Sequence, residues 1–74
     1  MSVKKYSVMI AGHRTSISLE PEFWEELKIL ARQEKLPFSA LITRIDERRD
    51  GNLSSALRLY VLRRLKQQRD CLDG

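Results

Sequence analysis

Residues 15–19 alternate strictly between two kinds of side chain, and this alternation constrains the fold more than any other stretch. In an extended chain Ser16 and Ser18 would point to one side, with Arg14 at the edge of that side. The opposite side would be buried, and it would carry Thr15, Ile17 and Leu19. A period of two predicts a strand over residues 14–19 with one buried face. A single strand is not stable alone, so this strand needs a partner.

The simplest partner for residues 14–19 is the same strand of a second copy, because everything downstream has the pattern of helices. Two such strands related by a two-fold axis would form an antiparallel ribbon with Arg14, Ser16 and Ser18 on one face. A two-stranded ribbon fits the major groove of DNA, where short donors and acceptors meet base edges. These three residues are therefore candidate base-reading residues, with Arg14 making a bidentate contact to guanine.

Residues 1–13 admit two structures, and the sequence leaves both open. Tyr6, Val8 and Ile10 recur with a period of two, and Gly12 can adopt the positive φ of a turn. The segment is either an N-terminal arm or an extra strand that folds back as a hairpin on residues 14–19. Hairpins on two copies would make a sheet roughly 14 Å wide at ~4.8 Å per strand, whereas the major groove is about 12 Å wide. The arm favours DNA binding, and the hairpin argues against it unless only the central strands meet the groove.

Three amphipathic helices are predicted after the strand, and proline and glycine separate them. Pro21 suits the first helical position and stands among glutamates, which favour the positive end of the helix dipole. Pro37 disfavours helix just before it, and Gly51 can cap the second helix before Asn52 caps the third. The predicted helices span residues 21–35, 37–49 and 52–68.

The third helix, residues 52–68, is apolar over more of its circumference than one buried stripe requires. Leu59, Leu62 and Leu65 fall outside its main stripe, and this excess indicates contact with a partner chain. We predict a mainly α fold with a short β-ribbon, formed by an intertwined homodimer, with a dimer of dimers as a further option. The predicted dimer core consists of Ile17, Leu19, Phe23, Trp24, Leu27, Leu41, Ile45, Leu57 and Tyr60.

Length and composition narrow the function classes. A chain of 74 residues forms one domain at most, and a domain this small usually needs oligomerisation or a staple. One cysteine, Cys71, and one histidine, His13, exclude an internal disulfide and make a metal site improbable within one chain. We expect no cofactor, no catalytic site and no membrane span, because no Ser–His–Asp or Cys–His pair stands out and no apolar run approaches ~20 residues. The net charge of +4 permits nucleic acid as a partner, and the lack of a disulfide framework suits the cytoplasm.

Five stretches of the sequence carry a resemblance to a known family. Residues 14–19, the acidic helix start after them and residues 36–42 resemble the ribbon-helix-helix (Arc/MetJ-type) family of bacterial DNA-binding proteins. Residues 10–16 and 51–58 are similar to strings from a subgroup of short bacterial ribbon-helix-helix domain proteins. The core of the resemblance covers residues 14–49, and the subgroup resemblance covers most of the chain.

The resemblance implies an obligate homodimer whose ribbon reads bases and whose second helix clamps a phosphate with its N-terminus. Carried over by position, the ribbon residues are Arg14, Ser16 and Ser18, and the clamp is the backbone around Phe38 and Ser39. Pro37 departs from the family pattern, because a Ser or Thr cap is usual there. Lys4, Lys5 and His13 are candidate phosphate contacts beside the groove, although the lysines could equally be solvated and His13 could be a turn residue.

The sequence therefore predicts a sequence-specific double-stranded DNA-binding protein that regulates transcription. It would be cytoplasmic, and nucleoid-associated when bound to DNA. Two-fold symmetry would require a palindromic or repeated site. The alternative is a protein–protein interaction module on the same dimeric scaffold, antitoxin-like or adaptor, that binds through the third helix without DNA. A purely structural dimer is the third option.

Overall fold

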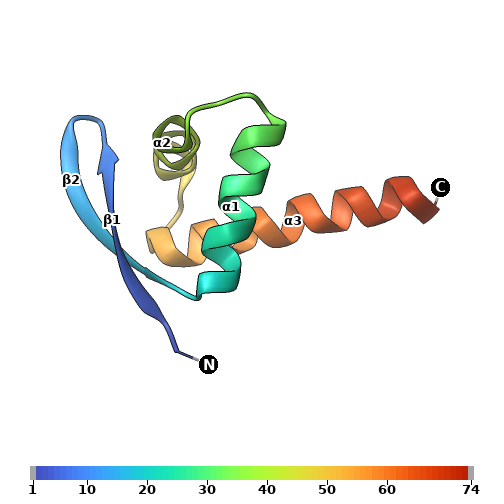
Figure 1. Cartoon of the computed structure of the whole chain (residues 1–74), viewed down its shortest axis with the longest axis horizontal. Coiled ribbons are helices and arrows are strands. Elements are labelled where there is room, and N and C mark those ends of the chain that lie inside the picture. Colours follow the sequence, from blue (N-terminus) through green and yellow to red (C-terminus); the bar gives the residue numbers. More distant parts are fainter. Residues whose placement is uncertain (1, 74) are drawn as a thin grey trace.

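Two strands form a ribbon at one end of the molecule, and three helices pack against one side of it (Figure 1). The computed structural model describes residues 2–73, and side chains as far as Arg69. The fold is mainly α with a short β-ribbon, which confirms the predicted fold class for a single chain. The elements are β1 (Lys4–Ile10), β2 (His13–Leu19), α1 (Pro21–Gln33), α2 (Phe38–Arg48) and α3 (Leu53–Asp73).

The N-terminal segment is the extra strand rather than an arm. β1 pairs antiparallel with β2 over their whole length, from Lys4 opposite Leu19 to Ile10 opposite His13. Ala11 and Gly12 connect the strands with φ values of 52° and 82°. Positive φ at both central residues matches the type I′ turn, whose twist suits a two-residue hairpin. The ribbon in the structure is therefore intramolecular, which differs from the expected pairing with a second copy.

The hairpin has one buried and one exposed face. Val8, Ile10, Ile17 and Leu19 lie on the helix-facing side, and each is at most 9% exposed. The opposite face is exposed throughout, and it carries Lys5, Ser7, Met9, Arg14, Ser16 and Ser18. The alternation in the sequence thus separates a core face from a solvent face, as a half-buried strand requires.

One hydrophobic core joins all five elements within the single chain. Leu19, Leu27, Leu41 and Leu57, from β2 and the three helices, are fully buried. The residues predicted as dimer core all lie in or against this core: Phe23, Trp24 and Tyr60 pack partly buried at its margin, and the other six are buried. Burial of these side chains is therefore achieved without a second copy.

Aromatic stacking fixes β1 and the start of α2 to α1. The rings of Tyr6 and Trp24 are nearly parallel, with centroids 4.0 Å apart. The ring of Phe38 meets Trp24 edge-on at 4.8 Å. Stacked and edge-on pairs stabilise beyond their burial alone, so the hairpin, α1 and α2 are held as one unit.

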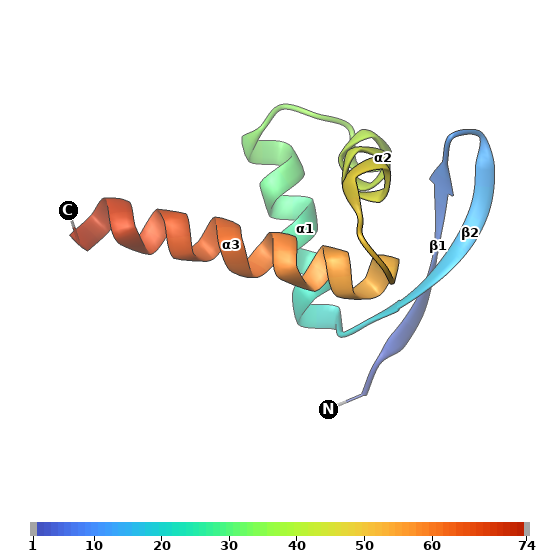
Figure 2. The same ribbon diagram turned by 180° about the vertical axis from the view of Figure 1, so that it is seen from behind.

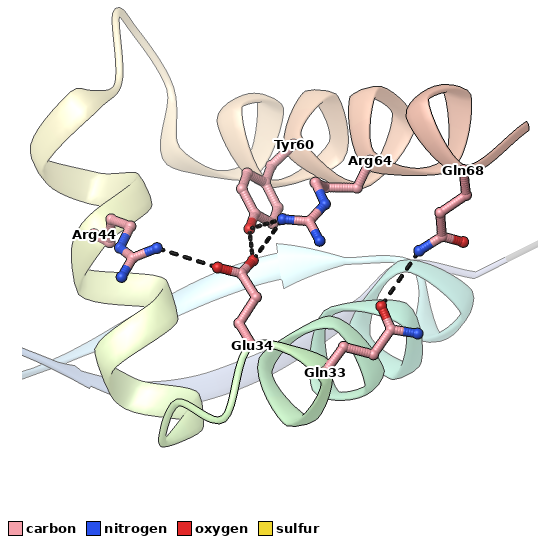
Figure 3. A network of polar contacts seen from close by, with 6 residues as sticks. All are labelled: Gln33, Glu34, Arg44, Tyr60, Arg64 and Gln68. Atoms are coloured by element: carbon pink, nitrogen blue, oxygen red, sulfur yellow. Dashed lines mark hydrogen bonds and ion pairs between the residues drawn. The ribbon is translucent and has the colours of Figure 1, made fainter. Parts of the chain in front are cut away.

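A polar network joins α3 to the C-terminal end of α1 and to the side of α2 (Figure 3). Glu34 follows α1 and accepts hydrogen bonds from Arg44 of α2 at 3.2 Å and from Arg64 of α3 at 2.8 Å. The hydroxyl of Tyr60 also donates to Glu34, and Gln68 donates to Gln33 at 3.3 Å.

Within residues 2–73 no helix is long and apolar enough to cross a membrane.

Candidate nucleic-acid interface

The exposed face of the hairpin gathers the three candidate base-reading residues. Arg14, Ser16 and Ser18 follow one another at every second position of β2 and point away from the helices. Across the ribbon they stand opposite Met9, Ser7 and Lys5, respectively. The face therefore combines two cations, three serines and one methionine, and it contains no acid.

Sequence reasoning missed Ser7 and Met9, and it assigned Lys5 only to the phosphates beside the groove. The signal was present, because residues 4–10 alternate as residues 13–19 do. A turn at Ala11 and Gly12 fixes the register of a two-residue hairpin, and that register sets Ser7 opposite Ser16. Ser7 and Met9 can be placed on this face only if residues 4–10 form the hairpin strand, and the sequence leaves the arm open as well.

The structure does not bring Lys4 and His13 to the same face as Arg14. Lys4 stands opposite Leu19 on the helix-facing side, and it lines a hollow together with Glu22 and Glu25 of α1. His13 stands opposite Ile10, also on the helix-facing side, and it lines a hollow to which Asp46 contributes. Of the three flanking cations, only Lys5 shares the exposed face with the serines.

The N-terminus of α2 lies beside the hairpin turn. Pro37 caps the helix, and its side chain makes no capping hydrogen bond. The amides of Ala40 and Leu41 donate to the carbonyl of Pro37 at 3.0 and 3.2 Å, whereas the preceding amides of a helix, here Phe38 and Ser39, have no acceptor within it. A hollow of about 550 Å³ separates this end from the turn, lined by Pro37, Ser39, Ala11 and Gly12 among others. The ring of Phe38 packs on Trp24, and Phe38 does not line this hollow.

The outer edge of β2 is open to another strand. In a two-residue hairpin the residues that flank the turn form a hydrogen-bonded pair, and such pairs then alternate along the ribbon. The peptide groups of Arg14, Ser16 and Ser18 consequently point away from β1. A hollow of about 630 Å³ runs along this edge, between β2 and the residues Asn52, Leu53 and Ser54 at the start of α3. The edge offers three amides and three carbonyls to a further strand.

Two carboxylates with shifted pKa values lie outside both strands and pair with arginines. A hydrogen bond from Arg58 at 2.8 Å lowers the pKa of Glu20, between β2 and α1. A hydrogen bond from Tyr60 and the charges of Arg64 and Arg44 lower the pKa of Glu34 despite its partial burial. Both carboxylates flank α1 and form ion pairs with arginines of α3, and Glu34 also pairs with Arg44 of α2. Among the described residues no group of three His, Cys, Asp or Glu side chains could hold a metal ion; the side chain of Cys71 lies outside the described residues.

Comparison with known proteins agrees with this geometry. The family model described as "Ribbon-helix-helix domain" matches residues 3–65, which is most of the chain. The chain therefore belongs to the ribbon-helix-helix domain family, whose members generally bind DNA. No curated protein and no solved structure matches the chain. The family match includes β1 and most of α3, so the hairpin strand and the third helix belong to the matched region.

Proposed function

We propose that the protein is a homodimeric, sequence-specific regulator of transcription that reads the major groove of double-stranded DNA with β2. The observation that carries the proposal is the exposed, acid-free face on which Arg14, Ser16 and Ser18 align. A strand ribbon with short polar side chains can enter the major groove. Family membership supports DNA as the partner.

The intramolecular hairpin requires the groove to be met by central strands. Pairing of β2 with β2 of a second copy would give the order β1, β2, β2, β1, and four strands at ~4.8 Å spacing are roughly 14 Å wide. A groove of about 12 Å admits the two central strands. These are the strands that carry Arg14, Ser16 and Ser18, while each β1 lies over a groove wall and presents Lys5 to the phosphates.

The free edge of β2 favours one register for this pairing. A two-fold axis at Ser16 sets Arg14 opposite Ser18 of the second copy. Every outward peptide group of Arg14, Ser16 and Ser18 then finds a partner, because residues of this set meet only one another. The twinned strands would read a palindromic or repeated site.

Each candidate residue has a distinct role in this complex. Arg14 would form the bidentate contact to O6 and N7 of guanine, which is the strongest direct readout available on this face. Ser16 and Ser18 would accept from or donate to several bases and so discriminate less. Lys5 and the backbone amides of Phe38 and Ser39 would bind phosphates, which position the ribbon without reading sequence.

The test is selection of random duplex DNA by the purified protein, followed by sequencing. Arg14→Ala should relax the preference at one base position of each half-site, at a cost of about 1–3 kcal/mol. Arg32→Ala is the matched control, because Arg32 is an exposed arginine on α1, outside the hairpin. Recovery of a symmetric motif that only Arg14→Ala degrades supports the proposal. Unchanged affinity and preference in Arg14→Ala would exclude the ribbon as the reader.

A second function is favoured by the surface of α3. Leu59, Leu62 and Leu65 are 47%, 49% and 40% exposed, although they belong to a helix with its own buried stripe. The same dimeric scaffold would then be an interaction module, antitoxin-like or adaptor, that binds a protein through α3. Salt separates the two functions: counterion release makes DNA binding fall steeply with salt, whereas an apolar contact depends on it little.

A further inference from the structure

The outward face of α1 combines three glutamates and two cations, Lys28 and Arg32, with one exposed isoleucine. Ile29 is 42% exposed, and Glu22 and Glu26 lie on the same side of the helix, seven and three residues before it. Neither glutamate takes part in an ion pair among the described residues. Glu25 lies beside them and is paired with Lys28 at 3.7 Å. This surface, Glu22, Glu25, Glu26 and Ile29, is here called the acidic face.

A hollow between α2 and α3 has the complementary character. It has a volume of about 320 Å³, and Ile45, Ala56, Leu59 and Tyr60 contribute apolar or aromatic lining. Four arginines and one acid stand around it: Arg44, Arg48, Arg49, Arg63 and Asp50. Arg44 and Arg49 are paired with Glu34 and Asp46, whereas Arg48 and Arg63 have no ion-pair partner among the described residues. This surface is here called the basic hollow.

The two surfaces lie on opposite sides of the molecule. α1 passes in front of α3 in Figure 1, and α3 passes in front of α1 in Figure 2. The acidic face is turned away from α3, since Leu27, Leu30 and Ala31 of α1 are buried on the other side of that helix. The basic hollow opens on the outer side of α3, opposite the side of Leu57 and Val61. One chain therefore cannot bring its own two surfaces together.

We infer that the acidic face of one copy docks into the basic hollow of a second copy, with Ile29 against Leu59 and glutamates beside Arg48 and Arg63. Because the two surfaces differ and face in opposite directions, the contact is heterologous and leaves a free surface at each end. Such a contact extends into open chains of protein rather than closing as a dimer. It is separate from pairing along β2 and does not depend on DNA.

The charges argue for this occupant over pairing of α3 with α3. Between Leu53 and Arg69 the helix carries five cations and no acid, so two copies of α3 side by side would repel. The first half of α1 is where the acids of the chain are concentrated, with Glu22, Glu25 and Glu26 within two turns. An apolar side chain preceded by glutamates complements an apolar hollow flanked by arginines in the sign of charge.

Sedimentation velocity of the DNA-free protein at rising concentration tests the inference. The sedimentation coefficient of the wild type should rise continuously with concentration, and the rise should weaken at high salt. Arg63→Glu and Ile29→Glu should each move the onset of association to roughly tenfold higher concentration. Lys66→Glu is the control, because Lys66 is an exposed cation of α3 outside the hollow. It should associate as the wild type does.

A mixture of the two defective variants gives the sharpest result. Ile29→Glu keeps an intact hollow and Arg63→Glu keeps an intact acidic face, so an equimolar mixture should regain association that neither variant shows alone. Circular dichroism checks that each variant is folded, and Ile29→Ala replaces Ile29→Glu where it is not. A wild type that does not associate beyond a dimer, a mixture that stays dissociated, or equal loss in Lys66→Glu would overturn the inference. Loss of DNA affinity in Arg63→Glu with unchanged association would overturn it too, and would assign the arginine to the DNA backbone.

Discussion

Nη1 of Arg64 lies 2.8 Å from Oε2 of Glu34, so an ion pair joins the middle of α3 to the residue that follows α1 (Figure 3). The other carboxylate oxygen of Glu34 lies 3.2 Å from Nη1 of Arg44 of α2. Only 19% of the Glu34 side chain is exposed, which strengthens both contacts relative to a solvated pair. A single carboxylate therefore connects the three helices.

Glu34→Gln should lower the free energy of unfolding by about 1–2 kcal/mol, because it removes the charge that two arginines and a hydroxyl share. Urea denaturation at neutral pH measures the change. Glu47→Gln is the control, since Glu47 is an exposed glutamate on α2 and its replacement should leave stability nearly unchanged. Equal stability of the two variants would show that the network contributes nothing.

The same carboxylate makes stability depend on pH in a defined direction. The pKa of Glu34 is lowered below its ordinary value of 4.5 by the hydrogen bond from Tyr60 and then by the charges of Arg64 and Arg44. The stabilisation is complete above about pH 5 and is lost as the pH falls through the lowered pKa. Thermal denaturation between about pH 7 and pH 3 should therefore show a smaller acid loss in Glu34→Gln than in the wild type. Parallel pH profiles would contradict this role.

Two substitutions in the hairpin turn should change the stability of the protein in opposite directions. Ala11 has φ of 52°, a conformation that costs an alanine roughly 1 kcal/mol, and asparagine tolerates it. Ala11→Asn should stabilise the protein by about 0.5–1 kcal/mol. Gly12→Ala should destabilise it by about 1 kcal/mol, for conformational reasons alone, because a Cβ at Gly12 would meet no atom within 4 Å. Urea midpoints that move in neither direction would indicate that residues 4–10 are an undocked arm in solution.

Docking of β1 on α1 can be measured through its aromatic pair. The rings of Tyr6 and Trp24 stack at 4.0 Å with an angle of 6° between their planes. A double-mutant cycle of Tyr6→Leu and Trp24→Leu should give a coupling free energy of about 0.5–1.5 kcal/mol. Tyr6→Leu with Phe38→Leu is the comparison, because Phe38 contacts Trp24 and Tyr6 couples to it only through that ring. A Tyr6–Trp24 coupling near zero would mean that the strand does not rest on α1.

Helix positions follow from local signals, whereas the strand partner does not. Pro21 and Pro37 stand at or just before the first residues of α1 and α2, as their fixed φ predicts. α1 ends two residues before the predicted range of 21–35, because Lys35 takes a φ of 59° that leaves the helix. The pairing of β1 with β2 within the chain is decided by tertiary packing. The stacking of Tyr6 on Trp24 and the burial of Val8 and Ile10 in the core stabilise this pairing.

In the candidate interface, too, some features follow from the local sequence pattern and others depend on tertiary packing. The period of two placed Arg14, Ser16 and Ser18 on one face, and they are exposed together. The sequence alone does not distinguish Lys4 from Lys5, although adjacent residues of a strand point to opposite faces. Only knowledge that residues 4–10 form a strand separates them, and that knowledge depends on long-range packing. The acidic face and the basic hollow likewise depend on how α1, α2 and α3 cross.

Because Lys4 and Lys5 point to opposite faces of the hairpin, their variants form a matched pair for testing DNA binding. Lys5 stands opposite Ser18 on the exposed face, and Lys4 stands opposite Leu19 on the helix-facing side near Glu22 and Glu25. In the proposed complex Lys5 reaches a phosphate and Lys4 does not. Lys5→Ala should weaken binding on every sequence alike and reduce the slope of log affinity against log salt by about one counterion per lysine. Lys4→Ala should leave that slope unchanged. Fluorescence anisotropy of a labelled duplex over a salt series measures both variants, and equal slopes for the two would place the DNA on a surface other than the exposed face of the hairpin.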